Sequence, residues 1–234
     1  MKQLILLAGF TLTLLHASAQ VQPKSIFINS SLGVQISNDQ ISKSRSYQIN
    51  PSVNYALNKS WAIGLSLSYN KYNIESGTTN EVVNPNTGYY LGSYKSESKS
   101  YDVVLGPQVR YYYPLSDKLS IFNEARAGLA LSSTEVNNSS SSYFRPYNGS
   151  DPYGTPISQG HQNSKNSALA IQANLAPGIS YLLNQHIGLE LKVRMVNYSK
   201  TIDDSRFPEG AKYPSSFETN LSLGNTSFGF NYYF

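Results

Sequence analysis

Charged side chains recur at every second position in several segments of this 234-residue chain, and they could form ion pairs inside a β-structure. Seven share the face opposite a nearly uncharged apolar face, and we predict that they cluster: Asp102, Arg110, Glu124, Arg126, Glu190, Lys192 and Arg194. Charges in a low-dielectric interior must be paired to be tolerated. The cluster therefore predicts either ion pairs that fill an interior or a gated path for ions, and both interpretations stay open.

Residues suited to catalysis or metal binding are few. Cysteine is absent, which excludes thiolate metal sites and thiol nucleophiles. His161 lies three residues before Ser164, but the sequence does not indicate a carboxylate that would orient the histidine for catalysis. A solvated histidine explains the spacing as well. Asp203 and Asp204 are too few for the oxygen shell that calcium requires. We therefore expect no enzyme activity, no metal and no cofactor.

The elements that must position the charged residues are strands. Apolar residues alternate with polar or small ones in eight segments, with predicted ranges 26–36, 47–57, 61–69, 101–113, 119–131, 169–181, 187–195 and 228–234. Most approach the ~9–11 residues that a tilted membrane strand needs. Pro51, Pro107 and Pro177 fall inside these segments, and we interpret them as bulges because proline cannot donate a ladder hydrogen bond. The alternation changes phase after Phe217, which leaves the start of the last strand open.

The connections between these segments alternate in length. Three are short, at 57–60, 114–118 and 184–186, and four are longer, at 38–46, 73–100, 132–167 and 199–216. Short turns on one side and long loops on the other are typical of outer-membrane barrels, with the turns in the periplasm and the loops outside. The sequence therefore predicts an all-β fold, an eight-stranded antiparallel up-and-down transmembrane β-barrel.

The composition indicates which face of the strands meets lipid. Only 14% of the residues are charged, against about 25% in ordinary soluble domains. The face opposite the apolar one combines small residues with a few charges of both signs, which suits a narrow lumen. Aromatic residues border the apolar face, as in interface girdles, namely Tyr55, Trp61, Tyr101, Tyr111, Tyr113, Tyr181, Tyr232 and Phe234. We therefore expect the apolar face to point outward into outer-membrane lipid.

The N-terminus has the pattern of an export signal. Lys2 precedes an apolar run, and Ala17-Ser18-Ala19 is a small-residue cleavage site. The run is too short for a spanning helix. We predict a secretory signal peptide at 1–19 and a barrel domain at 20–234. The net charge of +4 is scattered along the chain, so the sequence does not indicate nucleic-acid binding.

The C-terminus carries the most specific pattern, in which polar Ser227, Gly229, Tyr232 and terminal Phe234 are spaced as in a barrel-assembly signal. With this ending, the mature chain resembles the small eight-stranded outer-membrane β-barrels of Gram-negative bacteria, the OmpA/OmpX-like family. The resemblance implies recognition of the last strand by the barrel-assembly machinery and residence in the cell outer membrane. Larger members of the family carry a peptidoglycan-binding domain after the barrel, and cell-wall tethering is not implied for this chain.

The predicted long loops contain aromatic residues and an arginine that could contact an extracellular ligand: Tyr90, Tyr94, Tyr143, Phe144, Arg145 and Tyr147. Tyrosine and arginine are favoured at binding hot spots. Packing on an extended upper rim explains them equally well. We expect an integral outer-membrane barrel with a side-chain-plugged lumen and a structural or surface-interaction role, and the alternative is a small porin-like channel. The ligand stays unidentified.

Overall fold

The computed structural model describes residues 23–39, 41–84, 88–146, 155–206, 213, 215–219 and 226–234. The predicted signal peptide at 1–19 and Tyr147 lie outside these residues. Among the described residues, no helix is long and apolar enough to cross a membrane.

Ten antiparallel strands make up the described regular structure. They are β1 (Ile26–Asn38), β2 (Ser42–Ala56), β3 (Trp61–Asn84), β4 (Gly88–Pro114), β5 (Leu119–Pro146), β6 (Thr155–Leu182), β7 (Ile187–Val193), β8 (Val196–Asp204), β9 (Ser215–Thr219) and β10 (Thr226–Tyr233).

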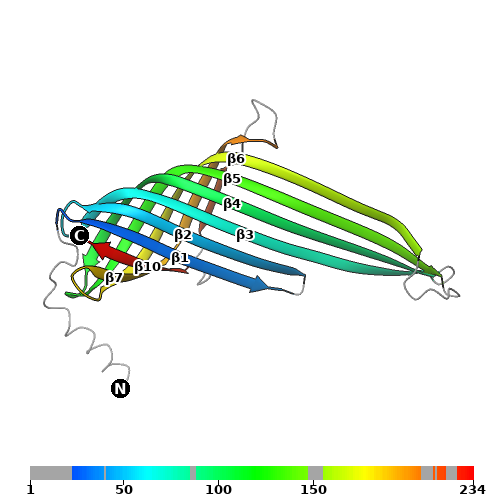
Figure 1. Cartoon of the computed structure of the whole chain (residues 1–234), viewed down its shortest axis with the longest axis horizontal. Helices are drawn as coiled ribbons and strands as arrows, with labels where there is room; N and C mark the ends of the chain where they lie inside the picture. Colours follow the sequence, from blue (N-terminus) through cyan, green and yellow to red (C-terminus); the bar gives the residue numbers. More distant parts are fainter. Residues whose placement is uncertain are drawn as a thin grey trace, which may run out of the picture.

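Eight of the strands close into a ring (Figure 1). Each of β1 to β6 pairs with the next strand, β7 joins β6 to β10, and β10 returns to β1 through pairs from Phe27↔Tyr233 to Leu32↔Phe228. The predicted eight-stranded antiparallel up-and-down barrel is therefore confirmed. β8 pairs with residues 168–175 of β6, and β9 pairs with β8. Neither strand is one of the eight that close the ring.

The three prolines interrupt the ladder in two different ways. At Pro51 and Pro107 the pairing with one neighbouring strand stops for two residues and resumes in the same register, while the pairing with the other neighbour continues. The prediction of bulges at these two positions is therefore wrong. In an antiparallel ladder each backbone N–H points to one neighbour only, so a proline removes a hydrogen bond on one side.

Pro177 coincides with a real shift of register. Gly178 pairs with Lys192, and Leu175 pairs with Val196. Three steps along β6 therefore correspond to four steps on the facing strand, which is a register shift of one residue. Arg194 and Met195 fall in this gap, which divides the predicted seventh strand into β7 and β8. The side-chain alternation of β7 consequently ends at the gap.

The ring is apolar outside and polar inside. Leu65 is 64% exposed, whereas the adjacent Ser66 is 6% exposed. Trp61 and Tyr111 pack with ring centroids 4.8 Å apart near the end where the short turns lie, and Tyr55, Tyr113, Tyr181, Tyr232 and Phe234 are also exposed. The outward orientation predicted for the apolar face is thus what the structure shows.

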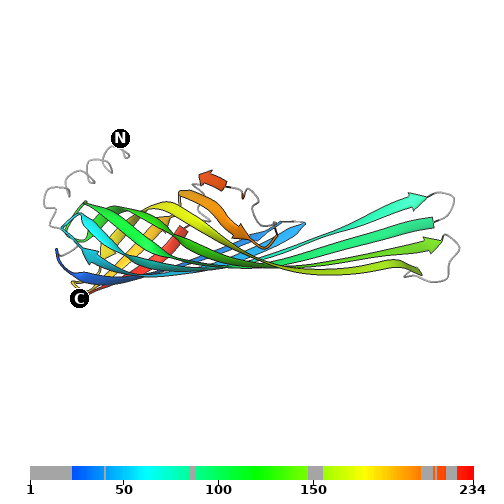
Figure 2. The ribbon, with the colours of Figure 1, turned by 90° about the horizontal axis from the view of Figure 1, so that it is seen from above.

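Four strands continue far beyond the ring (Figure 2). β3 pairs with β4 up to Asn84↔Gly88, and β5 pairs with β6 up to Phe144↔Thr155, so the two longest predicted loops are mainly strands. We call the part of these four strands that continues beyond the β1–β2 hairpin the extension. It consists of residues 77–84, 88–95, 139–146 and 155–161. Its strand order is β3-β4-β5-β6.

Candidate functional site

A small apolar layer lies in the lumen at the short-turn end. Phe27 and Tyr233 pack at 5.0 Å between ring centroids, and Tyr112 packs on Phe122 at 5.8 Å. These four side chains, with Ala56 and Ala62, form the buried hydrophobic cluster of the described residues. Their inward direction follows from the same alternation that points their neighbours toward lipid.

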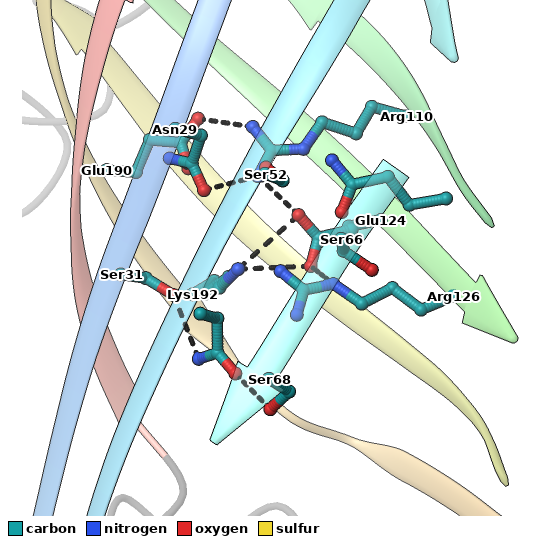
Figure 3. Close-up of polar contacts among 12 residues, drawn as sticks. Asn29, Ser31, Ser52, Ser66, Ser68, Arg110, Glu124, Arg126, Glu190 and Lys192 are labelled. Atoms are coloured by element: carbon teal, nitrogen blue, oxygen red, sulfur yellow. Dashed lines mark hydrogen bonds and ion pairs between the residues drawn. The ribbon is translucent and has the colours of Figure 1, made fainter. Parts of the chain in front are cut away.

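Above this layer lies a cluster of buried ion pairs (Figure 3). Arg110 on β4 pairs through Nη1 with Glu190 Oε1 on β7, at 2.7 Å, and through Nη2 with Glu124 Oε2 on β5. The three side chains are 0–1% exposed. Arg110 and Glu124 are direct cross-strand neighbours, whereas Glu190 reaches them across the lumen.

Glu124 is the centre of the cluster. In addition to Arg110, Lys192 places Nζ 3.0 Å from Glu124 Oε1, and Arg126 places Nε 2.7 Å from the same oxygen. One carboxylate therefore contacts three cations that come from β4, β5 and β7. We call the five residues Arg110, Glu124, Arg126, Glu190 and Lys192 the lumenal cluster.

Two of the seven residues predicted for this cluster are not part of it. Among the described residues, neither Asp102 nor Arg194 has an ion-pair partner within 4.0 Å. Asp102 lies eight residues above Arg110 on β4, too far along the strand to share its partners. Arg194 falls in the gap opposite Pro177, where the alternation of β7 stops.

Buried amides complete the lumenal cluster, and the sequence analysis did not identify them. Asn29 donates from Nδ2 to Glu190 Oε2 at 2.9 Å, and Asn231 donates to Glu190 Oε1 at 2.7 Å. Arg110 also donates to Asn29 Oδ1 at 3.0 Å and to the Tyr112 hydroxyl at 3.1 Å. The sequence pattern that predicts inward side chains was present at these positions, because Asn29 and Asn231 alternate with apolar residues as the charged residues do.

A second set of inward polar side chains lines β1 to β4. Asn50 donates to Ser31 Oγ at 3.1 Å and accepts from Gln48 at 2.9 Å, and Ser68 also donates to it. Asn54 donates to Ser52 Oγ at 3.1 Å and accepts from Gln108. The lumen wall that β1 to β4 form is thus polar beyond the apolar layer.

The predicted assembly signal lies on β10, which closes the ring. Ser227 and Gly229 face the lumen, whereas Tyr232 and Phe234 are exposed on the outside. A Cβ on Gly229 would stand 3.2 Å from Glu190 Cβ and 3.3 Å from Asn29 Nδ2. Glycine at this position therefore leaves room for the lumenal cluster, which is a structural role in addition to the predicted one.

Five of the six predicted ligand-contact residues lie on strands of the extension, and Tyr147 lies outside the described residues. Tyr90 and Phe144 pack at 4.8 Å between ring centroids, and Tyr94 donates to Asn138 Oδ1 at 3.1 Å while staying 47% exposed. Tyr143 is half-buried, and Arg145 is exposed and pairs with Tyr89 in the ladder. Some of these side chains therefore pack on the strands, and others are exposed, while their contact with a ligand stays a prediction.

One face of the extension forms a cleft of about 730 Å³. The tip of the β1–β2 hairpin, with Asp39 and Lys43, borders it, and Tyr94, Lys95 and His161 from the long strands line it. Lys95 Nζ lies 2.5 Å from Glu97 Oε1. The hydrogen bond from Lys95 lowers the pKa of the Glu97 carboxyl, and the same bond raises the pKa of Lys95.

The residues considered for catalysis or metal binding are not brought into one site. His161 lines the cleft, whereas Asp204 is paired with Arg206 and Asp203 accepts a 3.4 Å hydrogen bond from the Tyr213 hydroxyl. In the part of the chain that the structure describes, no three histidine or acidic side chains are arranged to hold a metal ion.

Comparison with curated proteins finds no significant match. Among solved structures, similar chains include Neisserial surface protein A (13% identity, TM-score 0.37, 89% of this chain and 97% of that chain covered). Others are the N-terminal β-barrel domain of Pseudomonas aeruginosa OprF (15%, 0.32, 92% and 100%) and Ail, the attachment invasion locus protein of Yersinia pestis (14%, 0.29, 90% and 97%). The family model described as "Outer membrane protein beta-barrel domain" matches residues 7–195. The chain therefore belongs to the outer membrane protein beta-barrel domain family.

Proposed function

We propose that this outer-membrane protein is a closed barrel that carries a rigid sheet on the cell surface for contact with an extracellular partner. The observation that supports this best is the continuation of β3 to β6 as one hydrogen-bonded sheet beyond the ring. A barrel that needed only to fill the membrane would have no use for strands that extend so far above it.

The lumenal cluster supports a closed lumen. An eight-stranded barrel is only just wide enough for its own side chains to fill it. Arg110 contacts its cross-strand neighbour Glu124 and, across that narrow interior, Glu190, and the apolar layer of Phe27, Tyr112 and Phe122 lies below it. A continuous water path would have to break buried ion pairs, which is costly in a low-dielectric interior.

The extension supports a contact role. Tyr90 and Tyr94 are exposed on strands whose backbone is held by ladder hydrogen bonds, so their positions are fixed before a partner arrives. Preorganised aromatic side chains lose little entropy on binding. The cleft bordered by Lys43, Tyr94 and His161 adds a concave surface with mixed polar and aromatic groups.

The proposal includes the route to the membrane. Residues 1–19 direct export, the barrel domain begins at Gln20, and the last strand, with Ser227, Gly229, Tyr232 and Phe234, is read by the barrel-assembly machinery. N-terminal sequencing of the mature protein should begin at Gln20. Deleting Phe234 should lower the yield of assembled barrel in cells. The stability of refolded protein should change little, because the Phe234 side chain is 66% exposed.

The orientation can be tested with single cysteines, because the natural chain has none. The short turns are proposed to face the periplasm and the extension to face outside. An impermeant maleimide on intact cells should label Arg145→Cys and leave Lys118→Cys unlabelled. The opposite labelling would place the extension in the periplasm and contradict a surface role.

Conductance in planar bilayers separates the closed barrel from the porin-like alternative. We expect refolded wild type to be silent. Discrete openings in wild type whose size changes in Glu124→Ala would make the lumenal cluster a gate, and the closed-barrel proposal would fail.

Contact by the extension needs a separate test. In a trimmed variant, residues 78–94 and 140–160 are each replaced by Asn-Gly, which joins the paired residues Gly77↔Lys95 and Ser139↔His161 by two-residue turns. Cells displaying wild type and trimmed barrel are compared on an array of immobilised glycans and proteins. Binding that is retained in the trimmed variant, or no binding by wild type, contradicts the contact role.

A further inference from the structure

The lumenal cluster has unequal numbers of acids and bases. Its three bases, Arg110, Arg126 and Lys192, face two acids, Glu124 and Glu190, and all are buried. Adding the nearby Asp102 and Arg194 changes neither the sign nor the size of the excess. An unbalanced charge inside a barrel, surrounded by lipid, is strongly unfavourable unless a counterion compensates it.

The excess positive charge lies on one side of the cluster. Both oxygens of Glu190 are occupied by Arg110, Asn29 and Asn231. Arg126 and Lys192 therefore depend on Glu124, which they share with Arg110. Among the described residues, Arg126 Nη2 is buried and has no hydrogen-bond partner. A guanidinium N–H without an acceptor in the interior indicates that an acceptor is needed there.

A cavity of about 40 Å³ lies beside these two bases on the side away from the apolar layer. Arg126, Lys192 and Arg194 line it, together with the amides of Asn50, Gln172 and Asn174. Of the described residues, Glu124 is the one carboxylate in its wall, and that carboxylate already contacts three cations. The volume suits one small ion, since a site for a single water needs roughly 10–15 Å³.

We propose that this cavity binds a small monovalent inorganic anion, with chloride as the reference species, between Arg126 and Lys192 (Figure 3). The anion supplies the missing negative charge, accepts the free Arg126 N–H and holds the upper part of the lumenal cluster in place. It is distinct from the extracellular cleft and does not depend on the contact role of the extension.

The test compares thermal unfolding of refolded full-length protein in sodium chloride and in sodium gluconate at equal ionic strength. Gluconate is too large for the cavity. We expect wild type to unfold at a higher temperature in chloride, and this difference to disappear in Arg126→Met, which leaves two bases and two acids. Lys118→Met, at an exposed turn, removes the same charge and should keep the chloride dependence of wild type.

Lys192→Met provides an independent variant in case Arg126→Met does not fold, because it also balances the cluster. Line broadening of the ³⁵Cl resonance by wild type, reversed by bromide and reduced at least tenfold in either variant, would show binding directly. Equal chloride dependence in wild type and both folded variants, or none in wild type, overturns the proposal.

Discussion

The extension continues four of the eight strands of the ring, yet the two regions are stabilised in different ways. In the ring every strand has two neighbours, and the inward side chains meet in a closed interior. In the extension, residues 77–84 of β3 and 155–161 of β6 have a strand on one side only. Continuous ladder hydrogen bonds are thus common to both regions, whereas closure and burial belong to the ring.

The same contrast separates two ion pairs. Arg110 and Glu124 are cross-strand neighbours whose side chains are 0% and 1% exposed, whereas Lys95 and Glu97 lie on one strand and are 60% and 33% exposed. Water screens the second pair, while the first has only protein around it. The comparison teaches that stability should be concentrated in the ring, which leaves the extension free to vary for contact.

The largest expected effect is that of removing the central carboxylate of the ring. Glu124→Gln leaves three bases around a neutral amide, and we expect a loss of about 3–5 kcal/mol in the free energy of unfolding. Urea unfolding in lipid vesicles measures it. The matched variant Glu97→Gln in the β4 strand near the extension should show no measurable change, and equal losses in the two variants would remove the contrast.

Removing an aromatic side chain should also lower the free energy of unfolding more in the ring than in the extension, by a somewhat smaller difference than for the carboxylates. Phe122→Ala removes a ring buried between Tyr112 and the Arg110 guanidinium, whose carbon lies 5.2 Å from the ring centroid. We expect a loss of about 3 kcal/mol. Phe144→Ala in the extension removes the contact with Tyr90 alone, and about 1 kcal/mol is expected. Thermal unfolding of both variants tests whether the apolar layer is the more sensitive region.

One glycine of the ring and one of the extension differ in how closely the neighbouring strand approaches them. A Cβ on Gly106 would collide with the Ala127 carbonyl oxygen and reach 2.5 Å from Gly128 Cα. A Cβ on Gly92 would meet nothing closer than the Asn80 oxygen at 3.9 Å. We expect Gly106→Ala to destabilise the barrel by about 1–3 kcal/mol and Gly92→Ala to be tolerated. Equal refolding yields and midpoints for the two variants would argue against tight packing at Gly106.

The smallest effect on the barrel is expected from removing the extension itself. The trimmed variant keeps the lumenal cluster, the apolar layer and the closing pairs of β1 with β10. Its unfolding midpoint in urea should stay close to that of wild type. A large drop would show that the extension stabilises the ring, and the two regions could then no longer be regarded as independent.

Much of the ring could be predicted from the sequence, because alternation carries the information. Residues such as Leu65 and Ser66 lie on opposite faces of a strand with a period of two, and one membrane-facing side makes that period visible. Asn29 and Asn231 could have been found by the same rule. The extension could not, because its Ser-, Asn- and Thr-rich strands are polar on both faces and show no alternation.

The sequence by itself determined the eight strands of the ring, the outward apolar face and the inward direction of Arg110, Glu124, Glu190 and Lys192, because these follow from local periodicity. Only the tertiary structure decided which charges meet. Arg110 contacts Glu190, eighty residues later in the chain, while Asp102 and Arg194 form no ion pair with the other described residues. Partners across a barrel depend on the stagger of its strands, and a one-residue shift such as that beside Pro177 moves every later side chain.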